Sequence, residues 1–268
     1  MSSLFAAARD CLDATTPDAK LEATFAAAAA FARGDLSIPL DAAPAEAIRM
    51  PGRPPRPALV PTRDLPQRGL GSDEGRAAFV HAISHIEFNA IDLAWDAVYR
   101  FRGLPREYYA DWVGVASDEA RHFVLLRGRL QQMGFDYGDF DAHNGLWELA
   151  EKTAADGLAR MALVPRVLEA RGLDVTPGMI RKLRGLGDAA TVAILEVILH
   201  EEVAHVAIGS RWFRWYCGQA GIAPGPRFRE LLMQHCGGVL RGPFNVEART
   251  AAGFDADELA MLQALAPH

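Results

Sequence analysis

Cysteine is scarce in this sequence of 268 residues, and no long hydrophobic run is present. The three cysteines, Cys11, Cys217 and Cys236, are not spaced as in CxxC or zinc-finger motifs, so we expect small, buried or half-buried residues in a reducing compartment. The apolar stretch 25–32 is too short to cross a bilayer, and the N-terminus lacks the pattern of a cleaved signal peptide. These absences predict a cytoplasmic protein without a membrane partner.

A strong excess of charge of either sign is also missing. The formal net charge of −6 gives no global attraction to nucleic acid or to anionic membranes, and leaves room for a local basic patch. Half of the residues are hydrophobic and 23% are charged, so we expect a globular protein.

Regular helix is excluded from the segment 34–72 by its many prolines. We expect this segment to run extended over the surface. Five arginines lie in it: Arg49, Arg53, Arg56, Arg63 and Arg68. A solvated strap is the interpretation that the composition favours, and a strip that contacts phosphate groups is the alternative.

Apolar spacing typical of helices covers most of the remaining chain, and no strand-like alternation of useful length is present. Thr16 and Pro17 predict a helix start, and Gly134 predicts a helix end. The expected helices are two stretches within 1–33, then about 74–102, 105–133, 145–172, a short one from 176, 187–218, 226–236 and 255–265. The predicted fold class is all-α.

A glutamate-plus-histidine step occurs twice on these helices, as Glu119-x-x-His122 and Glu202-x-x-His205. A lone glutamate precedes each copy at a matched distance: Glu87 lies 32 residues before Glu119, and Glu169 lies 33 residues before Glu202. Two helices with Glu-x-x-His and two that each supply one Glu form the ligand set of a carboxylate-bridged dimetal centre in a four-helix bundle.

Each of these six residues lies on an apolar helix face, where a lone carboxylate would cost several kcal/mol unless it is protonated or paired. Two divalent ions would balance four ionised glutamates beside two neutral imidazoles. The i, i+3 spacing also places Glu and His of each step on one helical face. We therefore interpret the set as a dimetal site rather than as salt bridges.

Several of these residues have simpler interpretations. A single Glu-x-x-His occurs often by chance, and Glu169, near the end of its helix, could be a lone buried or capping residue. Pro165 is expected to kink that helix. We predict that Asp118 supports His205 and that Glu201 supports His122, with solvated helix acids as the alternative. His81, His85 and His200 lie off the ligand faces and are expected to be satisfied core or surface histidines.

Two short helix–helix joins and one long connection favour a ferritin-like bundle over a simple up-down one. The expected segments are an N-terminal arm of helices and extended chain over 1–72, the bundle over 73–220, and a C-terminal helical extension packed on the bundle over 221–268. The aromatic run Trp212, Phe213, Trp215 and Tyr216 is expected to serve core packing or the packing of a homodimer, with electron transfer as the alternative.

The sequence resembles the ferritin-like family of domain of unknown function 455. The resemblance covers about residues 50–250, and the most similar stretches are 85–94, 118–123, 160–174, 201–209 and 243–249. It implies a ferritin-like bundle with a di-iron site, supports Glu169 as a ligand, and carries no established activity. A more distant similarity, to di-iron hydroxylases that act on tRNA, implies a nucleoside-like substrate and contact with tRNA at the level of fold analogy.

We therefore expect an oxidoreductase or hydroxylase that activates O2 at two iron ions, or at a Mn/Fe pair, on an unknown small substrate. By analogy with such bundles, Glu119 and Glu202 would bridge the metals, Glu87 would lie on the His122 side and Glu169 on the His205 side. No flavin or nicotinamide motif is present, so electrons would come from a separate donor. The alternatives are a ferroxidase or iron-binding protein and a non-catalytic structural bundle.

Overall fold

The computed structural model describes residues 2–39, 43–237 and 240–266, and most of them are helical, which confirms the all-α prediction. The chain divides into two compact units, Met1–Glu151 and Lys152–His268. This boundary falls inside the segment 73–220 that was predicted to form the bundle, and the division into three segments stays a prediction. No described helix has the length and apolar character that crossing a membrane requires.

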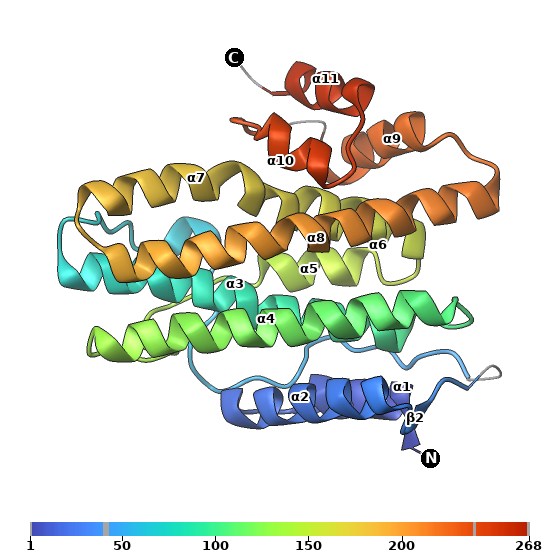
Figure 1. Ribbon diagram of the computed structural model, residues 1–268, viewed down its shortest axis with the longest axis horizontal. Coiled ribbons are helices and arrows are strands. Elements are labelled where there is room, and N and C mark those ends of the chain that lie inside the picture. The colour runs from blue at the N-terminus through green and yellow to red at the C-terminus, as the bar shows by residue number, and fades with distance from the viewer. Residues whose placement is uncertain (1, 40–42, 238–239, 267–268) are drawn as a thin grey trace. The chain divides into compact units, whose positions relative to one another are not determined.

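The first unit is built on a helical hairpin of α3 (Asp73–Arg100) and α4 (Arg106–Gln132), which lie side by side and antiparallel in Figure 1. Helices α1 (Leu4–Asp13) and α2 (Pro17–Arg33) pack against each other and cover this hairpin. Two short parallel strands, β1 (Ser2–Ser3) and β2 (Leu36–Ser37), join the ends of the N-terminal segment.

The predicted helix signals act as expected in this unit. The Thr16 hydroxyl accepts the backbone N–H of Ala19, and Pro17 begins α2, where its missing N–H costs nothing. Gly134 adopts a φ of +84° just after α4, a conformation that glycine takes without strain. In the segment 34–72 the described residues form no helix beyond the 3-10 turn η1 (Thr62–Asp64), as the prolines predict.

Helix α3 is buried on every side from Glu87 to Tyr99, so it is the core helix of its unit rather than an amphipathic surface helix. Besides Glu87, two acids lie within this stretch, and each is paired. Asp92 receives the Lys20 ammonium, which also donates to the carbonyl of Cys11, and Asp96 pairs with Arg100 at 2.6 Å. These pairs keep buried charges from being left uncompensated.

The second unit contains a second antiparallel hairpin, made by α7 (Ala170–Gly185) and the long helix α8 (Ala189–Ala220) (Figure 1). Helix α6 (Gly157–Leu163) and the π-helical segment η2 (Val164–Glu169) precede α7 and pack on α8. The remaining helices of the unit are α9 (Pro224–Cys236), α10 (Val246–Ala251) and α11 (Ala256–Ala264). Helix α5 (Gly145–Lys152) spans the boundary between the units.

The continuous helix expected over 145–172 was wrong. Helix α5 ends at Lys152, and Asp156 starts the next helix by accepting the backbone N–H of Ala159. Helix α7 then continues through Gly172 and Pro177 to Gly185, where a stop and a restart were predicted. Pro177 leaves the carbonyl of Leu173 without its helical N–H donor, and the side-chain amide of Asn245 donates to that carbonyl at 3.1 Å. Asn245 thus replaces the hydrogen-bond donor that Pro177 lacks.

A kink was predicted at Pro165, and at this position the helix changes to a π-helical segment that begins at Val164. Gly209 of α8 lies against this proline. A Cβ atom at position 209 would come within 2.3 Å of the Pro165 ring, a distance that real contacts do not reach. Glycine at this position therefore allows α8 to approach the π segment closely.

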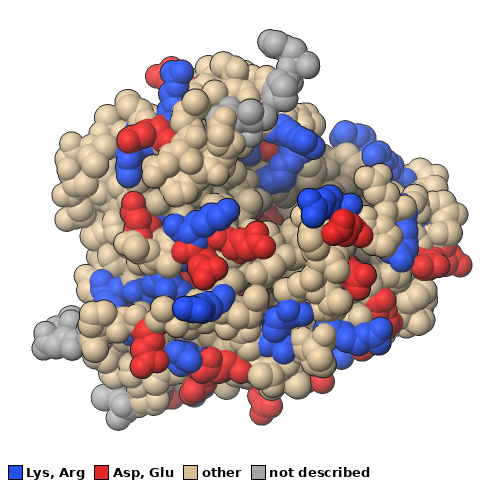
Figure 2. All heavy atoms as spheres, turned by 180° about the vertical axis from the view of Figure 1, so that it is seen from behind, with Lys and Arg blue, Asp and Glu red and all other residues tan. Residues whose placement is uncertain are grey.

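Basic and acidic side chains are interspersed over the described surface seen in Figure 2, which agrees with the lack of a charge excess in the sequence. The cysteines also behave as expected: Cys11 and Cys217 are buried thiols, and Cys236 is half-buried.

Gly209→Ala is expected to lower the free energy of unfolding by about 1–3 kcal/mol, because the new methyl group forces α8 away from Pro165. Gly218→Ala, in the same helix with no atom within 4 Å of the new Cβ, is the matched control and should leave stability unchanged or slightly raised. Urea unfolding measures both variants. Equal stabilities would contradict the close contact.

The folded protein is expected to lose stability in acid because the imidazole of His81 is buried. Burial lowers its pKa to about 4, although Asp139, Asp136 and Asp141 oppose the shift, and its Nε2 accepts the N–H of Gly138 at 2.9 Å. Between pH 6.5 and 4 the unfolded chain binds a proton at His81 and the folded chain does not, so stability falls as the pH falls.

Between pH 7 and pH 5 this histidine should account for about 2 kcal/mol of lost stability, measured by urea unfolding at both pH values. His81→Gln keeps an acceptor for Gly138 and cannot be protonated, so its stability should depend less on pH. His200→Gln, at an exposed position, should retain the original dependence. An unchanged pH dependence in His81→Gln would refute the assignment.

Candidate metal centre

Three of the six predicted ligands come together in the first unit, between the two helices of its hairpin. Glu87 lies on α3, and Glu119 and His122 lie on α4. The Nδ1 atom of His122 is 3.3 Å from Oε2 of Glu87 and 3.4 Å from Oε2 of Glu119. Each of the three offers a ligand atom within 4.8 Å of the others, and all three are buried. This group can hold a metal ion.

The two carboxylates determine the protonation of His122. Burial alone lowers the pKa of the imidazole, but the hydrogen bonds and charges of Glu119 and Glu87 outweigh it and raise the pKa to about 11. The site thus combines two buried carboxylates with one imidazole. Carboxylate oxygen with imidazole nitrogen is a donor set that suits divalent cations.

The other three predicted ligands lie in the second unit. Glu202 and His205 occupy one face of α8, with Oε1 of Glu202 3.4 Å from Nδ1 of His205, and both are buried. Glu169 is the last residue of the π segment η2, which packs on α8. Its side chain is half-buried, and its Oε2 atom is shielded from solvent. The six predicted ligands are thus divided evenly, with three in each unit.

The helical period explains why the i, i+3 steps point inward. On α4 the buried residues Trp112, Val115 and Leu126 share the face of Glu119 and His122. On α8 the ligand pair interrupts the buried series Leu195, Ile198, Gly209 and Trp212. Both steps thus lie on apolar faces, as the sequence predicted.

The predicted supporting acids lie one residue before each Glu-x-x-His step and are half-buried. Asp118 contacts Arg121 of its own helix at 3.2 Å. The proposed contacts of Asp118 with His205 and of Glu201 with His122 stay predictions.

The three histidines that were set aside are not part of either ligand set. His81 accepts from the backbone of Gly138. His85 is buried, with Nδ1 2.9 Å from the hydroxyl of Tyr137 and Nε2 3.0 Å from the carbonyl of His143, and burial lowers its pKa to about 4. His200 is exposed on α8. His81 and His85 are thus core histidines and His200 a surface one, but Nδ1 of His81 has no hydrogen-bond partner among the described residues, so it is not fully satisfied as predicted.

Sequence reasoning missed the buried ion pairs of the second unit. Arg166 of η2 pairs with Glu258 of α11 at 2.6 Å, and Arg249 of α10 pairs with Asp174 of α7 at 2.7 Å. Pairs so distant in sequence leave no spacing signal. The indication that could have been used is an arginine within an apolar stretch, such as Arg166 after Leu163, Val164 and Pro165.

A protein of Haemophilus influenzae strain Rd, described as an uncharacterized protein, is 45% identical over 213 residues, which cover 77% of this chain and 74% of that protein. No solved structure matches significantly. Residues 13–260 match the family described as "Protein of unknown function (DUF455)". The Glu-x-x-His steps, the lone glutamates and the arginines of the second unit all lie within the matched range, and the chain belongs to this family.

Proposed function

We propose that the two ligand sets together hold two metal ions, most simply two iron ions, as the centre of an oxidoreductase that uses O2. Glu87, Glu119 and His122 would serve one ion, and Glu169, Glu202 and His205 the other. The observation that carries this proposal is the buried group of two carboxylates and one imidazole between α3 and α4.

Charge supports two ions rather than one. Each unit provides two glutamates and one histidine, so the complete set carries four negative charges when both imidazoles are neutral. The pairing of other buried acids with Lys20, Arg100 and Arg249 indicates that this protein compensates its buried carboxylates. His122 lies beside Glu87 and Glu119, and His205 lies beside Glu202. Two divalent ions would balance four ionised glutamates beside two neutral imidazoles.

The helical hairpins support the same proposal. Each hairpin presents a Glu-x-x-His step on one long helix and a single glutamate from a helix or π segment beside it. Two such hairpins are the elements from which a ferritin-like four-helix bundle with interior metal ligands is built. The π segment that ends at Glu169 fits this role, because such segments re-aim side chains at functional sites.

Bound iron would supply O2-dependent redox chemistry, which oxygen and imidazole donors permit by leaving coordination positions open. The protein's own contribution is to fix the donors and to exclude water. His122 is fully enclosed and is held by two carboxylates, and Trp112 and Phe123 on the same helix are buried with it. Electrons would come from a separate donor, and the substrate would be a small or nucleoside-like molecule.

Glu119→Gln is expected to weaken anaerobic binding of Fe(II) at least tenfold, because it removes the charge of a buried ligand. Glu107→Gln removes the same charge from an exposed position of the same helix and should bind iron as the unchanged protein does. Equilibrium dialysis with metal analysis gives the affinity and the number of ions per chain. Equal iron binding by both variants would refute the ligand assignment.

Oxidoreductase activity predicts that the iron-loaded protein consumes O2 repeatedly when a reductant is present. His205→Ala should lower this rate at least tenfold, whereas His200→Ala, on an exposed position of the same helix, should leave it unchanged. An oxygen electrode measures the rate. Accumulation of many iron ions per chain would favour a ferroxidase or iron-binding protein instead, and a protein that binds no iron would favour a structural bundle.

A further inference from the structure

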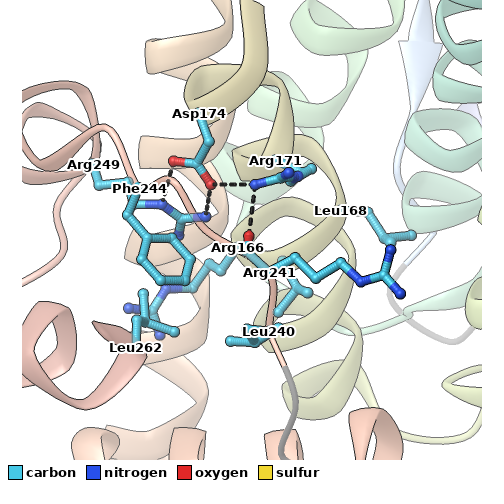
Figure 3. Close-up of a pocket in the computed structure, with 10 residues that line it drawn as sticks. Arg166, Leu168, Arg171, Asp174, Leu240, Arg241, Phe244, Arg249 and Leu262 are labelled. Carbon is cyan, nitrogen blue, oxygen red and sulfur yellow. Dashed lines mark hydrogen bonds and ion pairs between the residues drawn. The ribbon is translucent and has the colours of Figure 1, made fainter. Parts of the chain in front are cut away.

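A pocket in the second unit has no part in the proposed metal site. It has a volume of about 150 Å³ and lies among the π segment, the start of α7 and the chain that leads into α10. Its lining is Arg166, Val167, Leu168, Arg171, Asp174, Leu240, Arg241, Phe244, Arg249 and Leu262. Four of these ten residues are arginines, and one is an acid (Figure 3).

The charges around this pocket do not balance. Three of the four guanidinium groups, those of Arg166, Arg171 and Arg249, contact two carboxylates, those of Asp174 and Glu258. Asp174 lies between Arg249 and Arg171, and its carboxylate forms an ion pair with each of them (Figure 3). Two positive charges are thus left in excess in a partly enclosed space, where an anion with two negative charges would be strongly favoured.

Two of the arginines are fully buried and keep a donor unused. Arg166 donates from Nη2 to Glu258 at 2.6 Å and from Nε to Ser210 at 3.2 Å, and its Nη1 has no hydrogen-bond partner among the described residues. Arg249 donates from Nη2 and Nε to Asp174, and within the described part of the chain its Nη1 also lacks a partner. Buried N–H groups without partners are costly and rare, so a ligand that accepts from them is expected.

The guanidinium groups are held in place by their surroundings. Arg166 lies over the rings of Phe213, Phe228 and Phe254, with its Cζ atom 4.2–4.7 Å from their centres. Arg249 lies 5.2 Å from the ring centre of Phe244. Donors fixed in this way lose little entropy when they bind an anion.

The outer arginines shape the entrance. Arg171 donates from Nη1 to the backbone carbonyls of Arg241 at 2.7 Å and Pro243 at 3.3 Å, which fixes the chain that carries Arg241 and Phe244 to the pocket. Arg241 itself is exposed. Substitution of Arg241 can therefore test binding without removing a buried ion pair.

We propose that this pocket binds a phosphate group, as inorganic phosphate or as the phosphate of a small organic phosphomonoester. Phosphate carries close to two negative charges at neutral pH, and its oxygens can accept from several guanidinium groups at once. The ring of Phe244 and the side chains of Leu168, Leu240 and Leu262 offer an apolar surface for the organic part of a phosphomonoester.

A purely structural role explains only part of the arrangement. The pairs Arg166–Glu258 and Arg249–Asp174 fasten α11 and α10 to η2 and α7. They leave the two Nη1 atoms without an acceptor among the described residues. Burial also lowers the pKa of Arg166, with Glu258 opposing the shift, so the charged form is incompletely compensated by the protein alone. A bound anion accounts for both observations.

Isothermal titration with inorganic phosphate and with adenosine 5′-monophosphate, at constant ionic strength set with chloride, tests the proposal. Saturable binding is expected, and Arg241→Gln and Arg171→Gln should each weaken it at least fivefold. Arg229→Gln removes an exposed arginine of α9 outside the pocket and should bind as the unchanged protein does. Circular dichroism verifies that each variant is folded.

Tighter binding of the nucleotide would assign the site to phosphomonoesters, and equal binding would assign it to the free ion. No saturable binding of either ligand would overturn the proposal. So would equal affinities in the Arg241→Gln, Arg171→Gln and Arg229→Gln variants. Glu119→Gln, a change in the proposed metal site of the other unit, should bind phosphate normally, so the two proposals can fail separately.

Discussion

The cost of burying ionised side chains inside helices governs this structure. Helices α3, α4, α7 and α8 all carry charged or titratable groups on faces that water does not reach. Each such group must be compensated, or its burial would cost more than the net stability of a domain of this size allows. In most places the compensation is a single ion pair, as between Lys20 and Asp92 or between Arg249 and Asp174.

Two places depart from this pattern, and in opposite directions. Between α3 and α4 two buried carboxylates, those of Glu87 and Glu119, lie against the single imidazole of His122. Around the pocket of the second unit the guanidinium groups exceed the carboxylates. A surplus of carboxylates favours a bound cation and a surplus of guanidinium groups favours a bound anion, so the charge balance of buried groups distinguishes binding sites from structural ion pairs.

Structural features that depend on neighbours within one helical turn could be predicted from the sequence. The Thr16-Pro17 start of α2 and the inward direction of Glu119 and His122 follow from local rules of capping and helical period. The continuation of α7 through Pro177 could not be predicted, because it depends on an amide 72 residues further along the chain. The arginine-lined pocket could not be predicted for the same reason, because its ion pairs join residues that are 75 and 92 positions apart in the sequence.

The contact between Asn245 and the carbonyl of Leu173 gives the last third of the chain a role in completing an earlier helix. Helix α7 precedes residue 245 in the order of synthesis, so this carbonyl lacks its side-chain donor until Asn245 has been added. The helix reaches its full set of hydrogen bonds once the chain through α10 has emerged and docked, with Arg249 closing on Asp174 of the same helix. Folding of the second unit is therefore completed late in synthesis, and a nascent chain that ends before Asn245 holds α7 with one turn unsupported.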